Sequence, residues 1–139
     1  MRNFETSNIR NISLLGHRGS GKTTLVESIL YISKTLDKKG TVEDGTTVSD
    51  FDKEETRRLF SINTSIIPVE YGDCKYNFLD TPGYFDFSGE VYSALRVSGS
   101  AVIVMDATSG VEVGTEKAWR LLEERHLPRI IYLSLIHIS

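Results

Sequence analysis

Apolar and polar residues alternate along the chain in blocks that have the lengths of strands and helices. Residues 9–15 are mostly apolar toward their C-terminal end, which predicts a strand. The spacing of Leu25, Ile29 and Ile32 then predicts an amphipathic helix that runs to about Ser33, with these three residues on its apolar face. The first part of the chain is therefore expected to fold as a strand followed by a helix.

Two short strands are predicted to form a hairpin in the middle of the chain. Residues 66–71 have strand character, and Pro68 within them indicates an edge strand because proline cannot donate a hydrogen bond to a neighbouring strand. The turn residues Gly72 and Asp73 separate this strand from residues 76–79. We expect the two strands to pair antiparallel and to join the sheet that contains the first strand.

The last third of the chain continues the alternation of helices and strands. Residues 89–96 have helical spacing, and the continuous apolar run 101–105 predicts a strand buried on both faces at the centre of the sheet. Residues 115 to about 125 predict a helix before the strand 130–133, and its expected apolar face consists of Ala118, Trp119, Leu121 and Leu122. The prediction is an α/β fold, a mostly parallel sheet with an antiparallel edge hairpin.

Residues 38–62 break this pattern. The stretch is rich in Thr, Asp, Glu and Lys and holds few apolar residues. It is too long for an inert connection inside a compact domain, so we predict a mobile loop with a functional role.

Composition is that of an ordinary single domain. Of the 139 residues, 40% are hydrophobic and 25% are charged, and the net charge of −3 gives no overall attraction to nucleic acid. The single cysteine, Cys74, excludes an internal disulfide. No apolar run approaches the roughly 20 residues of a membrane span, and the polar start lacks the hydrophobic run of a signal peptide. We expect a cytoplasmic monomer that contacts no membrane and reads no nucleic-acid sequence directly.

A complete phosphate-binding loop lies between the first predicted strand and helix, since residues 16–23 match the pattern GxxxxGK[ST]. Its glycines let backbone N–H groups close around phosphates, and the helix N-terminus adds partial positive charge. Lys22 adds a full charge, and Thr23 offers a hydroxyl to Mg²⁺. The loop predicts that a nucleoside triphosphate is bound by Gly16, His17, Arg18, Gly19, Ser20, Gly21, Lys22, Thr23 and Thr24.

A second motif, Asp80-Thr81-Pro82-Gly83, follows the predicted strand 76–79. Ligands of open α/β sheets bind at the C-terminal ends of the strands, so this motif is expected beside the triphosphate. The Asp80 carboxylate can hold Mg²⁺ through a coordinated water, and the N–H of Gly83 can meet the γ-phosphate. All four residues therefore join the predicted nucleotide site, with Gly83 as the sensor of the γ-phosphate.

The phosphate loop, residues 80–91 and residues 106–111 together resemble the translational GTPases. The similarity covers about residues 9–133 and is greatest to the elongation factor G family. Its bacterial elongation factor G-like paralogues have a tyrosine after Asp-Thr-Pro-Gly and open the next helix as residues 113–119 do here. The resemblance implies a P-loop NTPase fold, GTP and GDP as ligands with Mg²⁺, hydrolysis by in-line attack of water, and the ribosome as partner.

Two positions depart from the family pattern. Ser61 aligns with the threonine of the first switch region, and it lacks the methyl group that restricts threonine, so we expect a less ordered GTP-bound switch. Tyr84 stands where elongation factor G has a histidine that orients the attacking water, and a neutral phenol predicts weak intrinsic hydrolysis. By resemblance the metal ligands are Thr23, Ser61 and Asp80, and the catalytic residues are Lys22, Gly83 and Tyr84.

The last residues lack the family's guanine-reading sequence Asn-Lys-x-Asp. Ser134-Leu135-Ile136-His137 stand at those positions and offer no carboxylate to the base. We therefore expect residues 1–133 to be an incomplete, C-terminally truncated GTPase domain and residues 134–139 to be an artefactual tail. Such a fragment is expected to be of marginal stability or prone to aggregation, and to bind nucleotide weakly with little base preference.

Other functions are compatible with the same motifs. The parent protein could be a relative such as peptide release factor 3 or a ribosomal protection protein. It could also be a nucleotide-dependent binding module with negligible turnover, an alternative that Tyr84 keeps open. A P-loop ATPase or kinase is disfavoured because residues 80–83 belong to the GTPase pattern. Ribosome-stimulated release of phosphate distinguishes the enzyme from the binding module.

Overall fold

A computed structural model of the chain describes residues 3–17, 19–33, 64–81 and 88–135. The predicted loop at residues 38–62 lies outside these described residues. No helix among the described residues is long and apolar enough to cross a membrane. The elements in chain order are η1 (Thr6–Asn8), β1 (Ile9–Gly16), α1 (Lys22–Ile32), β2 (Ser65–Tyr71), β3 (Cys74–Asp80), α3 (Ser88–Arg96), β4 (Ser100–Asp106), α4 (Val113–Glu124) and β5 (Arg129–Ser134).

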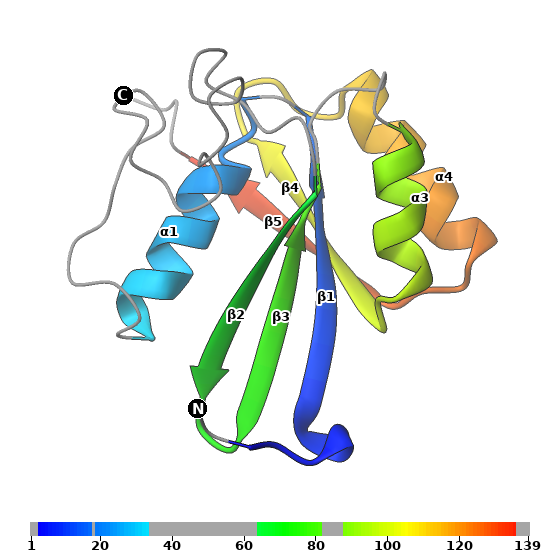
Figure 1. Cartoon of the computed structure of the whole chain (residues 1–139). Coiled ribbons are helices and arrows are strands. Elements are labelled where there is room, and N and C mark those ends of the chain that lie inside the picture. The colour runs from blue at the N-terminus through cyan, green and yellow to red at the C-terminus, as the bar shows by residue number, and fades with distance from the viewer. Residues whose placement is uncertain (1–2, 18, 34–63, 82–87, 136–139) are drawn as a thin grey trace.

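The five strands of the described residues form one sheet in the order β2-β3-β1-β4-β5 (Figure 1). β1 pairs in parallel with β3 and β4, and β4 pairs in parallel with β5. β2 runs antiparallel to β3, from Ser65 opposite Asp80 to Tyr71 opposite Cys74. The parallel strands therefore end at one edge of the sheet, where the phosphate loop connects β1 to α1.

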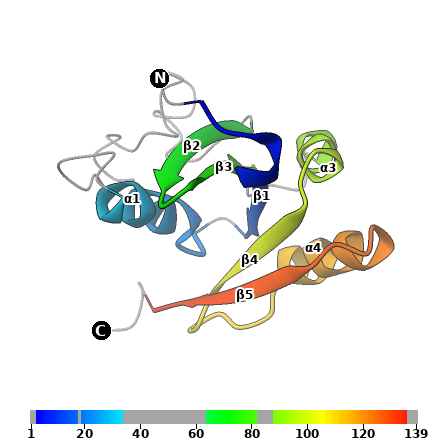
Figure 2. The same ribbon diagram turned by 90° about the horizontal axis from the view of Figure 1, so that it is seen from below.

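Helices cover both faces of the sheet. α1 lies on one face, and α3 and α4 lie on the other (Figure 1, Figure 2). Because neighbouring residues of a strand point to opposite faces, Leu14 and Leu15 of β1 enter two separate cores. The core around Leu14 contains Val26, Leu30, Ile67 and Val69, and the core around Leu15 contains Leu95, Ala101, Ile103, Ala118 and Leu122. β1 is thus buried on both faces and gives the phosphate loop a rigid support.

The predicted hairpin is confirmed. β2 is an edge strand, and it contains Pro68, which pairs with Asn77 of β3. Gly72 adopts a φ of 61° in the turn between β2 and β3. The predicted central position of residues 101–105 is wrong, because β4 lies between β1 and β5, and β1 is the central strand. A run of apolar residues indicates burial on both faces, and this condition also holds one strand away from the centre.

Two residues predicted to face the core are exposed. Ile32 at the end of α1 is 70% exposed, and Trp119 of α4 is 42% exposed. The buried apolar residues of α1 are Val26 and Leu30, which have the same four-residue spacing and form the neighbouring stripe of the helix. Trp119 is covered in part by Arg129, whose Cζ lies 4.7 Å from the ring centroid. A cation over an aromatic ring lets an indole remain at the surface.

β5 is an apolar strand at the other edge of the sheet. Its residues Ile130, Ile131, Tyr132 and Leu133 are between 43% and 69% exposed. Figure 2 shows β5 as the outermost strand on this side, with α4 beside β4 and β5. An edge strand with apolar side chains is a template for association with another chain.

Candidate functional site

The phosphate loop leaves β1 at Gly16 and enters α1 at Lys22. Gly19 and Gly21 adopt φ values of 81° and 100°, a left-handed backbone that favours glycine. Gly21 is the N-cap residue of α1 and forms no side-chain cap. The first N–H groups of a helix have no acceptor within the helix, so those of α1 are oriented to bind an anion.

Gly16 stands where two neighbours approach closely. A Cβ atom at this position would lie 2.7 Å from Ser20 Oγ and 2.9 Å from the carbonyl oxygen of Val104. Ser20 is buried, and its hydroxyl has no hydrogen-bond partner among the described residues. Buried hydroxyl groups are normally paired, so this one indicates a missing partner such as a bound ligand.

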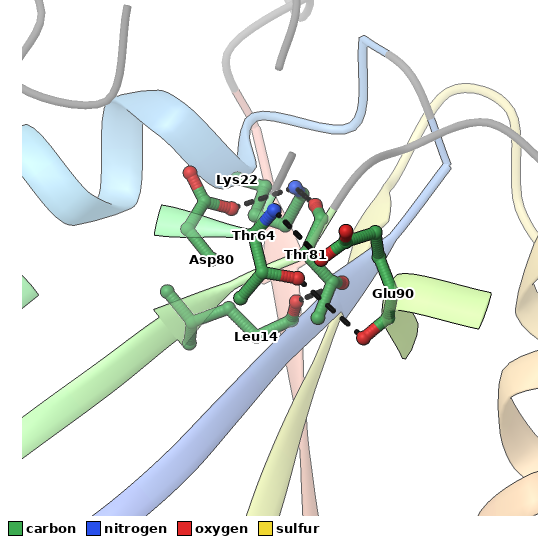
Figure 3. A network of polar contacts seen from close by, with 6 residues as sticks. All are labelled: Leu14, Lys22, Thr64, Asp80, Thr81 and Glu90. Carbon is green, nitrogen blue, oxygen red and sulfur yellow. Dashed lines mark hydrogen bonds and ion pairs between the residues drawn. The ribbon is translucent and has the colours of Figure 1, made fainter. Parts of the chain in front are cut away.

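Lys22 and Asp80 form a buried ion pair at the edge of the sheet (Figure 3). Lys22 Nζ lies 2.6 Å from Asp80 Oδ1 and also donates to the carbonyl oxygen of Thr81. The Lys22 side chain is 8% exposed, and the Asp80 side chain is fully buried. The structure therefore brings together one charged residue from each of the two sequence motifs.

Thr81 ties the end of β3 to β1. Its N–H donates to the carbonyl oxygen of Leu14 over 3.3 Å, and its hydroxyl donates to the same oxygen over 2.7 Å. Thr81 is almost fully buried. Asp80 is therefore the last residue of a paired strand, and the residue after it is fixed by two hydrogen bonds to β1.

The surroundings of Asp80 suit a hard cation. Asp80 Oδ2 is buried and has no hydrogen-bond partner among the described residues. Thr23 lies half-buried in the first turn of α1, directly after Lys22. Carboxylate and hydroxyl oxygens, together with water and phosphate oxygens, are ligands that Mg²⁺ accepts. No group of three or more His, Cys, Asp and Glu residues that could hold a metal ion occurs within the described ranges.

The predicted site residues divide into those that the structure describes and those that it does not. The described ones are Gly16, His17, Gly19, Ser20, Gly21, Lys22, Thr23, Thr24, Asp80 and Thr81. Arg18, Ser61, Pro82, Gly83 and Tyr84 lie outside the described residues, and their roles stay predictions.

Two contacts at this edge of the sheet belong to no motif in the sequence. His17 Nδ1 of the phosphate loop lies 3.7 Å from Oε2 of Glu112, and Glu112 is the N-cap residue of α4. The N–H of Thr64 donates to Glu90 Oε2 of α3 over 3.4 Å. The sequence could have indicated Glu112 through its capping-box spacing to Thr115. The Thr115 hydroxyl accepts a hydrogen bond from the Glu112 N–H. Thr64 and Glu90 have no comparable local signal.

Relatives of this chain carry the names of translation factors. Residues 7–135 match the family described as Elongation factor Tu GTP binding domain. The chain is 41% identical over 134 residues to elongation factor G 2 of Streptomyces coelicolor, and these residues make up 96% of this chain and 20% of that protein. It is 39% identical over 126 residues to the elongation factor G-like protein of Mycobacterium tuberculosis, with coverage of 91% and 18%. The chain spans about a fifth of the length of the curated relatives it matches.

Solved structures share the fold. A crystal structure of a Thermus thermophilus protein superposes with a TM-score of 0.87 at 39% identity, over 91% of this chain and 19% of that one. The translation elongation factor SelB of Methanococcus maripaludis, solved with the GTP analogue GppNHp, gives a TM-score of 0.71 over 100% of this chain and 24% of that one. Its 20% identity supports a likeness of fold alone.

Proposed function

Because the chain belongs to the family of the elongation factor Tu GTP binding domain, we propose that it binds GTP and GDP with Mg²⁺ and that its full-length parent hydrolyses GTP as an elongation factor G-like translation factor. The observation that carries this proposal is the buried pair of Lys22 and Asp80 at the N-terminus of α1. In the pair, the Lys22 ammonium group would bind a phosphate and the Asp80 carboxylate would bind a metal ion. Binding of a magnesium nucleotide requires both kinds of group.

Phosphate binding is assigned to the loop and the first turn of α1. Lys22 has three N–H donors, and the described residues engage two of them, at Asp80 and Thr81. The third is assigned to a phosphate oxygen. The backbone N–H groups of the loop and of α1 complete the cradle, which extends from Gly16 to Thr24 and includes His17 and Arg18.

Metal binding is assigned to Thr23, Ser61 and Asp80. Asp80 Oδ2 supports this assignment because it is buried and has no hydrogen-bond partner among the described residues. Bound Mg²⁺ would neutralise charge on the β- and γ-phosphates. The ion pair with Lys22 keeps the other Asp80 oxygen in place, so the carboxylate presents Oδ2 in one orientation.

Hydrolysis is assigned to the residues that follow Thr81. The N–H of Gly83 would sense the γ-phosphate, and Pro82 precedes it in the same motif. Tyr84 would orient the attacking water through its hydroxyl. A phenol that stays neutral supplies no positive charge to the transition state, so slow intrinsic turnover follows from this assignment.

The ribosome is the proposed partner of the full-length parent, and the cytoplasm its proposed location. Support comes from relatives named elongation factor G, although two relatives, from Candida dubliniensis and Danio rerio, are named mitochondrial ribosome-releasing factor 2. Ser134 to His137 offer the guanine base no carboxylate, so we propose that this chain distinguishes GTP from ATP weakly.

Thermal unfolding with nucleotide tests the binding proposal. A ligand at about 100 times its Kd adds about 2.7 kcal/mol of stability, so Mg-GTP is expected to raise Tm by several degrees. Mg-ATP is expected to do nearly the same. Lys22→Met should abolish the shift, whereas Lys75→Met, which changes a lysine at the opposite end of β3, should retain it. No shift in the unsubstituted chain would refute the proposal.

Turnover distinguishes the enzyme from a binding module. Release of phosphate from GTP by the full-length parent is expected to rise when ribosomes are added. Nucleotide binding without such stimulation would instead favour a switch with negligible hydrolysis, the alternative that Tyr84 keeps open.

A further inference from the structure

His17 of the phosphate loop faces the start of α4. Its Nδ1 atom lies 3.7 Å from Oε2 of Glu112, and the two side chains are 36% and 34% exposed. Glu112 is the N-cap residue of α4, whereas His17 directly follows β1. The contact therefore joins the loop that leads into one helix to the first turn of another helix.

A compact turn after β4 carries Glu112 to this place. The Asp106 carboxylate accepts hydrogen bonds from the N–H and the hydroxyl of Thr108, over 2.9 and 2.8 Å. The N–H of Gly110 donates to the carbonyl oxygen of Asp106 over 2.9 Å, and the φ of Gly110 is 67°. Glu112 then donates its own N–H to the Thr115 hydroxyl of α4 over 3.2 Å. The backbone on both sides of Glu112 is thus held by hydrogen bonds of its own.

The register of the sheet brings this turn to the phosphate loop. Gly16 of β1 pairs with Val104 of β4, so the connections that follow the two strands leave the sheet at the same edge (Figure 1). His17 is the next residue after Gly16, and its carbonyl oxygen accepts the N–H of Ser20 over 3.0 Å. Holding the His17 side chain therefore limits the movement of the turn that leads into α1.

We propose that Glu112 is a positioning residue for the phosphate loop and acts through His17, an inference that rests on the proposed function. A loop that binds phosphate with its backbone N–H groups loses conformational freedom on binding, and this loss lowers its affinity. The contact with α4 removes part of that freedom before nucleotide binds. GTP and GDP share the β-phosphate that such a loop cradles, so Glu112 supports the binding of both nucleotides.

The residue types suit this role. A carboxylate attracts an imidazole N–H, and it attracts an imidazolium ring more strongly. Glutamate is not among the preferred N-cap residues, which are Ser, Thr, Asp and Asn. The side chain of aspartate is one methylene group shorter and would extend less far toward His17. The length of Glu112 is therefore explained by the contact with the phosphate loop and not by capping of α4.

The test measures the affinity of the 139-residue chain for GDP and for a non-hydrolysable GTP analogue by isothermal titration calorimetry. Glu112→Asp keeps the charge and provides a better N-cap but withdraws the carboxylate from His17. We expect it to weaken both nucleotides about threefold, the range for a half-exposed pair. Glu112→Gln, which keeps an oxygen acceptor but loses the charge, should have a similar effect. The control Glu116→Gln, at an exposed residue in the first turn of α4, should change affinity by less than about 1.5-fold.

A double-mutant cycle tests whether the effect passes through His17. His17→Gln should also weaken both nucleotides, and adding Glu112→Asp to it should cause no further loss, because the two changes remove one contact. Additive losses would show that the residues act separately and would overturn the proposal. Full affinity in Glu112→Asp would overturn it as well, since capping of α4 would then be the only role of Glu112.

Hydrogen exchange separates this inference from the proposed function. The N–H of Glu116 is bonded to the carbonyl oxygen of Glu112 over 3.1 Å, so its exchange reports on the first turn of α4. Linkage is reciprocal, so nucleotide should slow this exchange in the unsubstituted chain and should slow it less in His17→Gln. Binding of nucleotide with no difference between these two chains would refute the inference and leave the proposed function standing. If the unsubstituted chain binds neither nucleotide, the proposed function fails and the inference fails with it.

Discussion

Replacing Lys22 by methionine is expected to lower the free energy of unfolding by about 3–5 kcal/mol. Lys22 Nζ lies 2.6 Å from Asp80 Oδ1, and the Asp80 side chain is fully buried. At an effective dielectric constant of about 20, the attraction across that distance is roughly 6 kcal/mol before desolvation is counted. Without Lys22 the carboxylate remains desolvated and loses its counterion. Its second oxygen already has no hydrogen-bond partner within the described ranges.

The two reciprocal substitutions are expected to behave differently. Asp80→Asn should cost only about 1–3 kcal/mol, because Lys22 keeps its hydrogen bond to the Thr81 carbonyl oxygen. The double variant Lys22→Met with Asp80→Asn should recover at least half of the loss, because it leaves no charge buried. Its magnesium-nucleotide binding should nevertheless be absent. Stability and function at this pair would thereby be separated.

Urea denaturation provides the assay, followed by circular dichroism and by the fluorescence of Trp119. With a slope of about 2 kcal/mol per molar urea, Lys22→Met should lower the midpoint by about 2 M, and the control Lys75→Met should change it little. If Lys22→Met is already unfolded in buffer, the double variant should restore a cooperative transition. A double variant no more stable than Lys22→Met would refute the reasoning.

Four further substitutions test the geometry and the sequence. Gly16→Ala should lower nucleotide affinity and reduce the free energy of unfolding by about 1–3 kcal/mol, because the added methyl group would meet a buried hydroxyl and a backbone carbonyl. Gly89→Ala in α3, where the space is open, should raise it by about 0.5–1 kcal/mol, and urea titration of both variants checks the two signs. Ile130→Lys should raise the concentration at which light scattering first detects association, since a charge on β5 opposes edge pairing; an unchanged threshold would exclude β5 as the template. Tyr84→His should speed single-turnover hydrolysis of GTP under activating conditions, and an equal rate would argue against a direct role of the phenol.

Local signals explain why much of the fold was predictable. Pro68 restricts its strand to an edge, and the residues Gly72 and Asp73 mark the turn, so the hairpin follows from a few side chains. The phosphate loop combines glycine conformations with the first residues of a helix, and its pattern is readable in one short segment. The predicted resemblance to translational GTPases is confirmed by the family match over residues 7–135.

Other features depend on tertiary packing and left no local signal. Leu25 and Ile29 have the same four-residue spacing as Val26 and Leu30, so the sequence alone allows either pair to form the buried stripe. Packing against Leu14 selects Val26 and Leu30. The order of β1 and β4 depends on pairing across the sheet. In the site, the sequence placed Asp80 at the strand end, whereas its direct pairing with Lys22 follows from the register of the folded strands.

The central position of β1 has a consequence for the time course of synthesis. Ile9 pairs with Lys75, and Ile12 pairs with Ser100, so the partners of this strand emerge 66 and 88 residues after it. At about 5–20 residues per second, the strand waits roughly 3–18 s for them. Contacts this distant in sequence also close slowly in the finished chain. β1 is thus made early but is paired on both sides only after β4 has been made, so its apolar residues lack their strand partners throughout that interval.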